Sequence, residues 1–349
     1  MRFISLIFVF ICCCASCRKE PFKENFIKMS EYDIPIVNAT ETEHKIPEEE
    51  RIGLFDVRIA GNHIIISKEY NDFLIHFIDT KTLNAIKILH VGRGPGEAIN
   101  SYYIGMSQDR SQIWAKDLGF NKINVFNIDD VVNGNKQPAM TITQDEYRGN
   151  EMDIVIANDS IYTSPIMGDA TDRFNVYDMT YKYCRSFGEF PDLKETSGLP
   201  EKTYTSVFSG HFVFMPDFDR FAFAHSHTSL ISIYSSNGEI ISNSWGPESV
   251  FPDFEITEEN QVGNLRLNPV SWNPPYTMTY LTLRYYDKKL YALYNGTRTK
   301  GSKIIVLDNT GIPLNMINID KTLVRFDIDP EKRCIWGIDS DNSLCSFIY

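Results

Sequence analysis

The sequence predicts an all-β protein, a six-bladed β-propeller of four-stranded antiparallel blades that is closed by an N-terminal strand. A phrase of two short strands recurs six times along the 349 residues, at spacings of about 40 to 73 residues. No long amphipathic helical pattern interrupts these copies. The aromatic share of 13% is high, and aromatic side chains favour strands.

Each copy of the phrase is an apolar, aromatic second strand followed by a third strand. The second strands are expected at His63–Ile66, Gln112–Ala115, Ser160–Thr163, Arg220–Phe223, Lys289–Ala292 and Arg333–Trp336. The third strands are expected at Leu74–Asp79, Ile123–Asn127, Phe174–Asp178, Leu230–Tyr234, Ile304–Asp308 and Leu344–Phe347. One four-stranded sheet cannot cover both of its own faces, so stacking such sheets around an axis is the arrangement that buries them.

The N-terminus is typical of an export signal. Arg2 precedes an apolar run of eleven residues, Ile4 to Cys14, which is too short to span a bilayer. The run ends in Cys14-Ala15-Ser16-Cys17, which resembles a bacterial lipobox in which Cys17 is lipidated; a plain secretory signal or a short membrane anchor is the alternative. We therefore expect a signal peptide at 1–17, a tether at 18–30 and the propeller at 31–349.

The two ends of the chain are expected to complete one blade together. The last block has strand patterns at 323–328, 334–338 and 343–349 and then stops without a fourth. The unassigned segment Tyr32–Val37 could supply that strand and remove an open edge.

Two connections stand out. Gly92-Arg93-Gly94-Pro95-Gly96-Glu97 cannot continue a strand and lacks the context of a phosphate-binding loop, so we expect a structural turn in which Arg93 and Glu97 lock neighbouring blades. The insert from about Trp245 to Pro275 is aromatic, which favours an ordered cap over a flexible linker.

The lipobox-like start, the six blocks and the run His90–Glu97 together resemble the TolB-like six-bladed β-propeller lipoproteins of Bacteroides-type bacteria. The resemblance implies the fold and a location in the cell envelope. Arg18 after Cys17 resembles lipoproteins that are sent on to the outer membrane, with Cys17 as the attachment to the bilayer. The resemblance supplies no catalytic residues.

Charge and cysteine content narrow the function. A net charge of −12 without a basic stripe argues against nucleic acid as a partner. Cys334 and Cys345 flank a turn signal and either form a cross-strand disulfide or are two small buried residues. Cys184 is expected in the core.

A ligand-binding face is expected where the loops between second and third strands meet the connections between blades. The candidate residues there are Lys68, Tyr70, Arg93, Glu97, Phe120, Asp169, His225, His227 and Arg298. Mixed charges and aromatic rings suit a sugar, a peptide or a protein partner, and the alternative is an ordinary solvated face.

Two pairs of residues carry narrower hypotheses. His225 and His227 could bind a metal with Asp217, Asp219 or His211, but a structural role is the favoured interpretation, and no metal or other cofactor is predicted. Arg58 and Arg284 fall at equivalent places in first strands, which line the central channel. They either receive an anionic ligand or pair with Asp56 and Asp327, and we favour pairing.

The leading functional hypothesis is a non-enzymatic, lipid-anchored envelope propeller that binds a protein or glycan partner. The alternative is an enzyme of the same fold, a lactonase-like hydrolase or a lyase, with a divalent metal in the channel. A purely structural envelope protein is the third.

Overall fold

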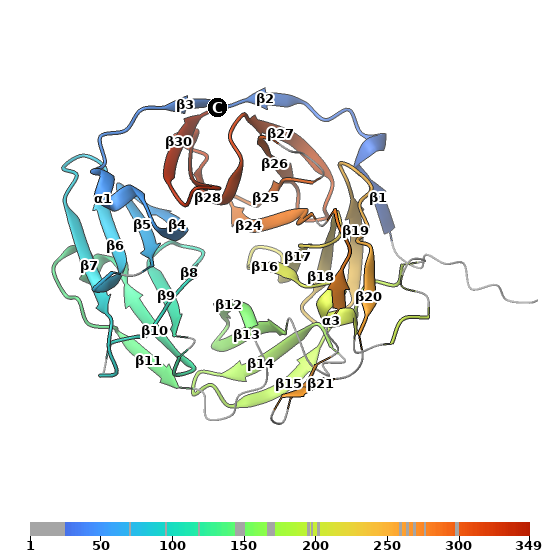
Figure 1. Ribbon diagram of the computed structural model, residues 1–349, viewed down its shortest axis with the longest axis horizontal. Helices are drawn as coiled ribbons and strands as arrows, with labels where there is room; N and C mark the ends of the chain where they lie inside the picture. The colour runs from blue at the N-terminus through green and yellow to red at the C-terminus, as the bar shows by residue number, and fades with distance from the viewer. Residues whose placement is uncertain are drawn as a thin grey trace, which may run out of the picture.

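The protein is a ring of six antiparallel blades around a central channel (Figure 1). This computed structural model describes residues 25–69, 71–94, 96–117, 119–143, 151–165, 172–193, 196, 198–200, 203–257, 260–262, 265–267, 270–275, 277–296 and 300–349. In each blade the first strand faces the channel and the last strand lies at the outside. The six blades that the sequence predicts are confirmed.

The strands of the blades follow in chain order. Blade 1 contains β4 (Leu54–Ala60), β5 (His63–Lys68), β6 (Phe73–Asp79) and β7 (Ala85–His90). Blade 2 contains β8 (Ile104–Met106), β9 (Gln112–Asp117), β10 (Lys122–Asn127) and β11 (Met140–Thr143). Blade 3 contains β12 (Glu151–Ala157), β13 (Ser160–Pro165), β14 (Phe174–Asp178) and β15 (Tyr183–Phe187).

Blade 4 contains β16 (Gly210–Met215), β17 (Arg220–His225), β18 (Leu230–Ser235) and β19 (Ile240–Trp245). Blade 5 contains β24 (Tyr280–Tyr286), β25 (Lys289–Tyr294), β26 (Ser302–Leu307) and β27 (Pro313–Ile319). Blade 6 contains β28 (Leu323–Asp329), β29 (Cys334–Asp339), β30 (Leu344–Ile348) and β3 (Thr40–Thr42). Short helices α1 (Glu48–Arg51), α2 (Ile128–Val132) and α3 (Tyr204–Val207) lie in connections.

The core of the protein lies between the blades. In β5, Ile64, Ile65 and Ile66 are completely buried although their side chains point to opposite faces of the sheet. Each face therefore packs against a neighbouring blade; Phe77 of blade 1, for example, shares one apolar cluster with Phe126 of blade 2. This two-sided burial explains why the second and third strands are continuous apolar runs in the sequence.

An N-terminal strand closes the ring, as predicted, but the closing residues differ from those expected. β3 pairs antiparallel with β30, with Thr40 opposite Ile348. The predicted segment Tyr32–Val37 instead leads into β2 (Ile36–Asn38), which runs parallel to β27 as a fifth strand of blade 5. Both segments have strand-forming sequences, and only the position of the free edge of blade 6 decides which of them closes it.

The segment that precedes β2 also lies on the ring. Residues 25–30, expected in the tether, form β1 (Asn25–Lys28) and the start of a 3-10 turn. β1 runs parallel to β19 of blade 4, and Met29 is buried in the apolar cluster of blades 4 and 5. The ordered domain therefore begins before residue 31. None of the helices in the described part of the chain has the length and apolarity to cross a bilayer.

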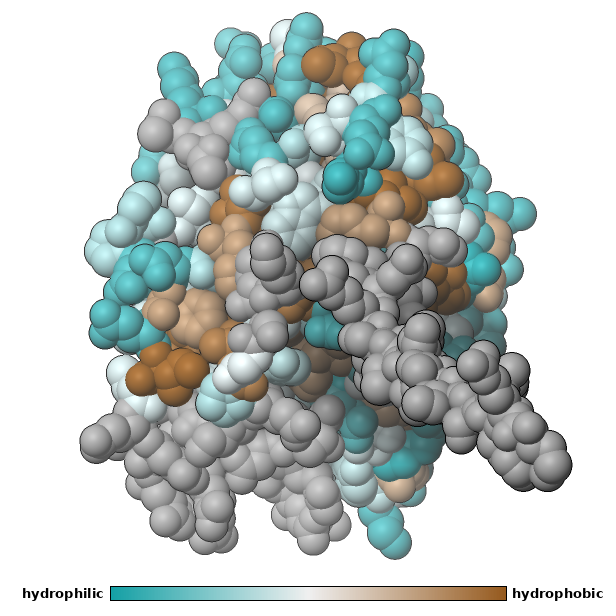
Figure 2. Space-filling model, turned by 90° about the vertical axis from the view of Figure 1, so that its right-hand side faces the viewer, coloured by the Kyte–Doolittle hydropathy of each residue, from teal (hydrophilic) through white to brown (hydrophobic). Residues whose placement is uncertain are grey.

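The described part of the insert is ordered as two pairs of short strands. β20 (Phe254–Ile256) pairs with β23 (Val270–Trp272), and β21 (Asn260–Val262) pairs with β22 (Leu265–Leu267). Phe251 and Phe254 pack beside an apolar cluster that contains Phe208 and Leu230. The surface on this side of the ring carries apolar groups between polar ones (Figure 2). The prediction of an ordered cap is confirmed for these residues.

The cysteine predictions need correction. All three described cysteines are free, and the register pairs Cys334 with Ile348 and Cys345 with Gly337, so Cys334 and Cys345 do not face each other. Cys345 is buried and donates a weak hydrogen bond to the Gly337 carbonyl at 3.3 Å. Cys184 is exposed on the outer strand β15, because the outside of a blade has no neighbouring sheet to cover it.

Candidate functional site

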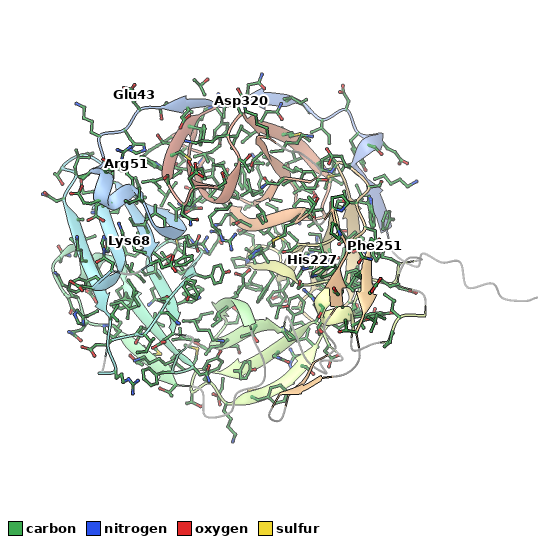
Figure 3. The ribbon with its side chains drawn as sticks, viewed as in Figure 1. Glu43, Arg51, Lys68, His227, Phe251 and Asp320 are labelled. Atoms are coloured by element: carbon green, nitrogen blue, oxygen red, sulfur yellow. The ribbon has the colours of Figure 1, made fainter. Side chains whose placement is uncertain are left out.

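The structure divides the predicted loop-face residues into different groups. Tyr70, Asp169 and Arg298, like the lipidation residue Cys17, lie outside the described residues. Lys68 is not at the surface: it is 4% exposed, its ammonium donates to the Glu49 carbonyl, and it lies 3.9 Å from the Glu50 carboxylate (Figure 3). Burial lowers its pKa. It is therefore a structural cation and not part of a binding face.

Glu50 explains why Lys68 is buried. Its carboxylate is placed by α1 against Lys68, His76 and Lys87. Burial alone would raise the Glu50 pKa, but hydrogen bonds from His76 and Lys87 outweigh it and lower that pKa to about 2. The contact joins segments that are far apart in the sequence, so inspection of the sequence around Lys68 could not reveal it.

Arg93, Glu97 and Phe120 do lie close to one another. Glu97 accepts a hydrogen bond from the Gly94 amide at 2.6 Å, so it fastens its own turn rather than a neighbouring blade. The Arg93 guanidinium carbon lies 5.9 Å from the centre of the Phe120 ring, and Phe120 is 39% exposed. The expected turn is thus present, and Arg93 links it to blade 2 through a cation–π contact.

His225 takes a structural role. It is completely buried; its Nδ1 lies 3.0 Å from the Phe208 carbonyl oxygen and its Nε2 lies 3.0 Å from Ser232 Oγ. His227 stacks on Trp272 with ring centres 4.2 Å apart. Burial holds the pKa of both rings below 6.5, at about 4 for His227. In the described residues no three His, Cys, Asp or Glu side chains are grouped to hold a metal ion.

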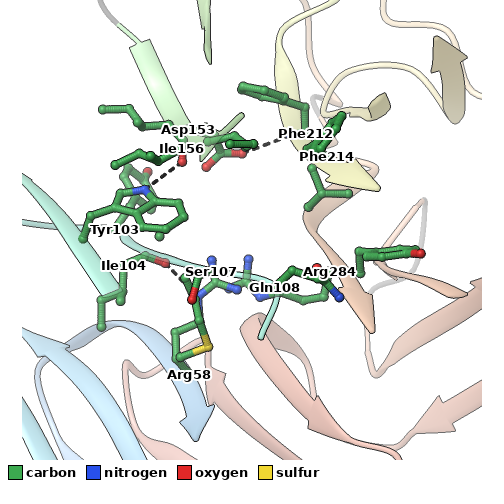
Figure 4. Close-up of a pocket in the computed structure, with 18 of the residues that line it drawn as sticks. Arg58, Tyr103, Ile104, Ser107, Gln108, Asp153, Ile156, Phe212, Phe214 and Arg284 are labelled. Atoms are coloured by element: carbon green, nitrogen blue, oxygen red, sulfur yellow. Dashed lines mark hydrogen bonds between the residues drawn. The ribbon is translucent and has the colours of Figure 1, made fainter. Parts of the chain in front are cut away.

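The central channel contains a cavity with a volume of about 300 Å³. All six first strands line it, and so do the turns that join first to second strands, through Ser107, Gln108 and Pro216 (Figure 4). None of the predicted loop-face residues is part of the described lining. The cavity and the predicted loop face are therefore different places, and of the predicted site residues Arg58 and Arg284 line the cavity.

Carboxylates in the channel bind the backbone of the next blade. Asp56 of blade 1 accepts from the Ile104 amide of blade 2 at 3.0 Å, and Asp327 of blade 6 accepts from the Ile59 amide of blade 1 at 2.8 Å. Asp153 of blade 3 accepts from the Phe212 amide of blade 4 at 3.2 Å. These bonds satisfy amides of first strands, whose inner edge has no further strand to pair with.

Arg284 pairs as the favoured interpretation predicted. Its guanidinium donates to Asp56 at 3.0 Å and to the Phe326 carbonyl at 3.1 Å, and Asp327 lies 3.9 Å away. Burial and the neighbouring charge of Arg58 lower its pKa to about 10, so it remains charged at neutral pH. Every nitrogen of this guanidinium has a protein acceptor.

Arg58 differs from Arg284. Its Nε donates to the Ile104 carbonyl at 2.7 Å, but neither terminal nitrogen has a hydrogen-bond or ion-pair partner among the described residues. Asp56, which the sequence suggested as its partner, pairs with Arg284 across the channel. Arg58 therefore presents an unpaired, charged fork to the cavity, and that fork matches a carboxylate.

Several lining residues were not predicted from the sequence. Arg110 reaches from the turn after β8 to the carbonyls of Ile59 and Ile328. Trp114 donates to the Ile154 carbonyl at 2.9 Å, and Lys116 lies beside it on β9. One pattern in the sequence could have indicated the channel lining. Charged residues alternate with apolar ones in two first strands, as Asp56-x-Arg58 and, in reverse order, as Arg325-x-Asp327.

The fold and channel define a class of six-bladed propellers with a charged central cavity. The description TolB-like 6-blade propeller-like matches residues 54–331, and the chain belongs to this family. No curated protein matches the sequence.

Two solved structures share the fold. A DUF4221 member from Bacteroides vulgatus is 10% identical, with a TM-score of 0.51 over 88% of this chain and 96% of its own. A protein of Bacteroides fragilis that is described as exported is 13% identical, with a TM-score of 0.52 over 92% and 98% of the two chains. At these identities the likeness concerns the fold alone.

Proposed function

We propose that this protein is a non-catalytic binding module of the cell envelope that holds the carboxylate of an acidic ligand in its channel. The observation that supports this proposal is the unpaired guanidinium fork of Arg58 in a cavity of about 300 Å³. Four cationic side chains and three carboxylates line this cavity, and each carboxylate already has protein donors. An added anion would therefore meet a net positive site.

The cavity has room for one carboxylate and the part of the ligand that is bonded directly to it. Tyr102, Trp114 and Phe214 contribute aromatic surface to the lining. Such surface suits either a sugar acid or the acidic side chain or end of a peptide, and both would offer the same carboxylate to Arg58. We know of no feature in the described residues that favours the hydrolase or lyase alternative.

A thermal-shift titration of the full chain would test the proposal. Glucuronate, galacturonate and a short Asp- and Glu-rich peptide would be compared with glucose, galactose and an uncharged peptide. We expect a saturable rise in melting temperature with the acidic compounds, because a ligand that binds only the folded state stabilises it. A rise with the sugar acids alone would indicate a glycan ligand, and a rise with the acidic peptide alone would indicate a protein ligand.

Two variants make the test specific. Arg58→Gln should abolish the rise, whereas Arg93→Gln, which removes a cation from the loop turn, should retain it. Equal rises with neutral sugars, or a full response in Arg58→Gln, would contradict the proposal. A flat response to every acidic compound would favour a purely structural envelope protein.

Attachment to the outer membrane through a lipid on Cys17 belongs to the same proposal. The supporting feature is the lipobox-like sequence at residues 14–17. Metabolic labelling with an alkyne fatty acid should mark the wild-type protein in bacterial membranes. Cys17→Ser should be unlabelled and leave the membrane fraction, and persistent labelling of that variant would refute this site.

A further inference from the structure

Arg173 is a second cation without a carboxylate partner among the described residues, and it lies in a different blade from Arg58. It immediately precedes β14 in blade 3 and is completely buried. None of its Nε, Nη1 and Nη2 atoms has a hydrogen-bond partner in the described structure. A guanidinium carries five N–H donors and no acceptor, so all of its polar capacity is unsatisfied.

The groups around Arg173 are mainly aromatic. Its guanidinium carbon lies 3.4 Å from the centre of the Phe223 ring and 5.3 Å from that of Phe190. The Phe223 ring belongs to β17, so the side chain lies at the junction of blades 3 and 4. Cation–π attraction partly stabilises the charge of the guanidinium, but it provides no acceptor for the N–H groups.

Nearby polar groups do not provide that acceptor. The two ring nitrogens of His225 are already engaged by the Phe208 carbonyl and Ser232. Tyr234 lies near enough to interact electrostatically with Arg173, but a phenol is neutral at neutral pH. Burial lowers the Arg173 pKa only to about 9, so the guanidinium keeps its charge there. A buried ion of this kind needs a counter-charge.

We propose that Arg173 binds a small inorganic anion of the size of chloride, enclosed between blades 3 and 4. Complete burial limits the ligand to a monatomic or similarly small ion. An anion beside the guanidinium would accept from its unsatisfied N–H groups and would balance its charge. A single water molecule would supply an acceptor but not the missing charge.

The melting temperature of the full chain, first freed of halide by dialysis, would test this site. At constant ionic strength, replacing gluconate with chloride or bromide should raise it by about 3 °C in a saturable manner. Arg173→Met should remove the halide dependence. Arg185→Met should preserve it, because Arg185 makes a cation–π contact with Phe187 in the same blade but is exposed.

Crystals of the wild-type protein grown in bromide provide a measurement that does not depend on a variant folding. An anomalous peak within hydrogen-bond distance of the Arg173 guanidinium is expected. Absence of that peak, or a melting temperature that is the same in halide and gluconate, would overturn the proposal. Neither result depends on whether an acidic ligand binds near Arg58.

Discussion

Two regions of the ring differ in how neighbouring blades are held together. From blade 6 through blade 1 to blade 2, buried charged side chains on the channel side bind the backbone of the neighbouring blade, with Asp56, Asp327 and Arg284 at the centre. Between blades 3 and 4, a cluster of aromatic rings fills the interface, with Phe174 and Phe221 among its buried members. Blades 3 and 4 also share a channel bond, from the Phe212 amide to Asp153, so the two regions differ in what accompanies such bonds: the buried ion pairs of Arg284 in one and an interface filled with aromatic rings in the other.

The difference explains where charge remains available. In the polar junctions each carboxylate already accepts a hydrogen bond from a backbone amide or from Arg284. Arg58 therefore has no carboxylate partner among the described residues, and it faces the channel cavity. In the aromatic junction no described carboxylate pairs with Arg173, and it is left over inside the protein. The first arrangement leaves a cation accessible to a larger ligand, and the second leaves one accessible only to a small ion.

The largest effect is expected from breaking the aromatic junction. Phe174→Ala should lower the free energy of unfolding by about 3–5 kcal/mol, because loss of the ring leaves a cavity between the neighbouring aromatic rings. Denaturant unfolding measures this loss. Ile36→Ala is the matched control at a 60% exposed position and should change stability by less than about 0.5 kcal/mol. A loss below about 1 kcal/mol for Phe174→Ala would show that the cluster collapses to fill the gap.

Breaking the polar junction should cost somewhat less. Asp56→Asn keeps one acceptor oxygen but removes the closer of the two carboxylates that pair with Arg284, leaving Asp327 at 3.9 Å, and we expect a loss of about 2–3 kcal/mol. Asp341→Asn, at an exposed turn, serves as the control. In a double-mutant cycle, Arg284→Met should recover part of the loss, since it removes the uncompensated charge. Strictly additive losses would mean that the pair does not act as a unit.

The smallest expected effect concerns the pH dependence of stability. Burial lowers the pKa of His227 from 6.5 to about 4, so the unfolded chain takes up a proton first as pH falls. Stability should therefore decline below about pH 6.5, and this ring contributes a loss of about 1 kcal/mol at pH 5.5. His225 acts in the same direction.

Glu50 and Asp153 have lowered pKa values, so their contributions are present above the carboxylate pKa of the unfolded chain and are lost only in stronger acid. His227→Phe, which can still stack on Trp272, should flatten the curve between pH 6.5 and 5. Unfolding midpoints across this range would measure the difference. An unchanged curve in His227→Phe would contradict the assignment to this ring.

The blades could be predicted because each carries its own signal of short apolar, aromatic runs that stacking buries on both faces. The closing strand could not, since Ile36–Asn38 and Thr40–Thr42 both contain β-branched residues that can form a strand, and only the tertiary edge decides which of them closes blade 6. The same limit applied to the candidate site. Asp56 is two residues from Arg58 yet pairs with Arg284, and Lys68 is buried with Glu50, so partners from other segments of the chain decided each role.

The N-terminal segment has a mechanical consequence. Residues 25–42 run along the outer strands of blades 4, 5 and 6 in turn, as β1, β2 and finally the closing strand β3 (Figure 1). A pull on the chain before Asn25 would peel β1 from β19, then β2 from β27, and would reach the ring closure last. Those first residues, 25 to 39, would release about 50 Å of slack before the ring itself bore any tension. The detachment of β1 and β2 would thus take up the first extension of the chain and delay the opening of the ring.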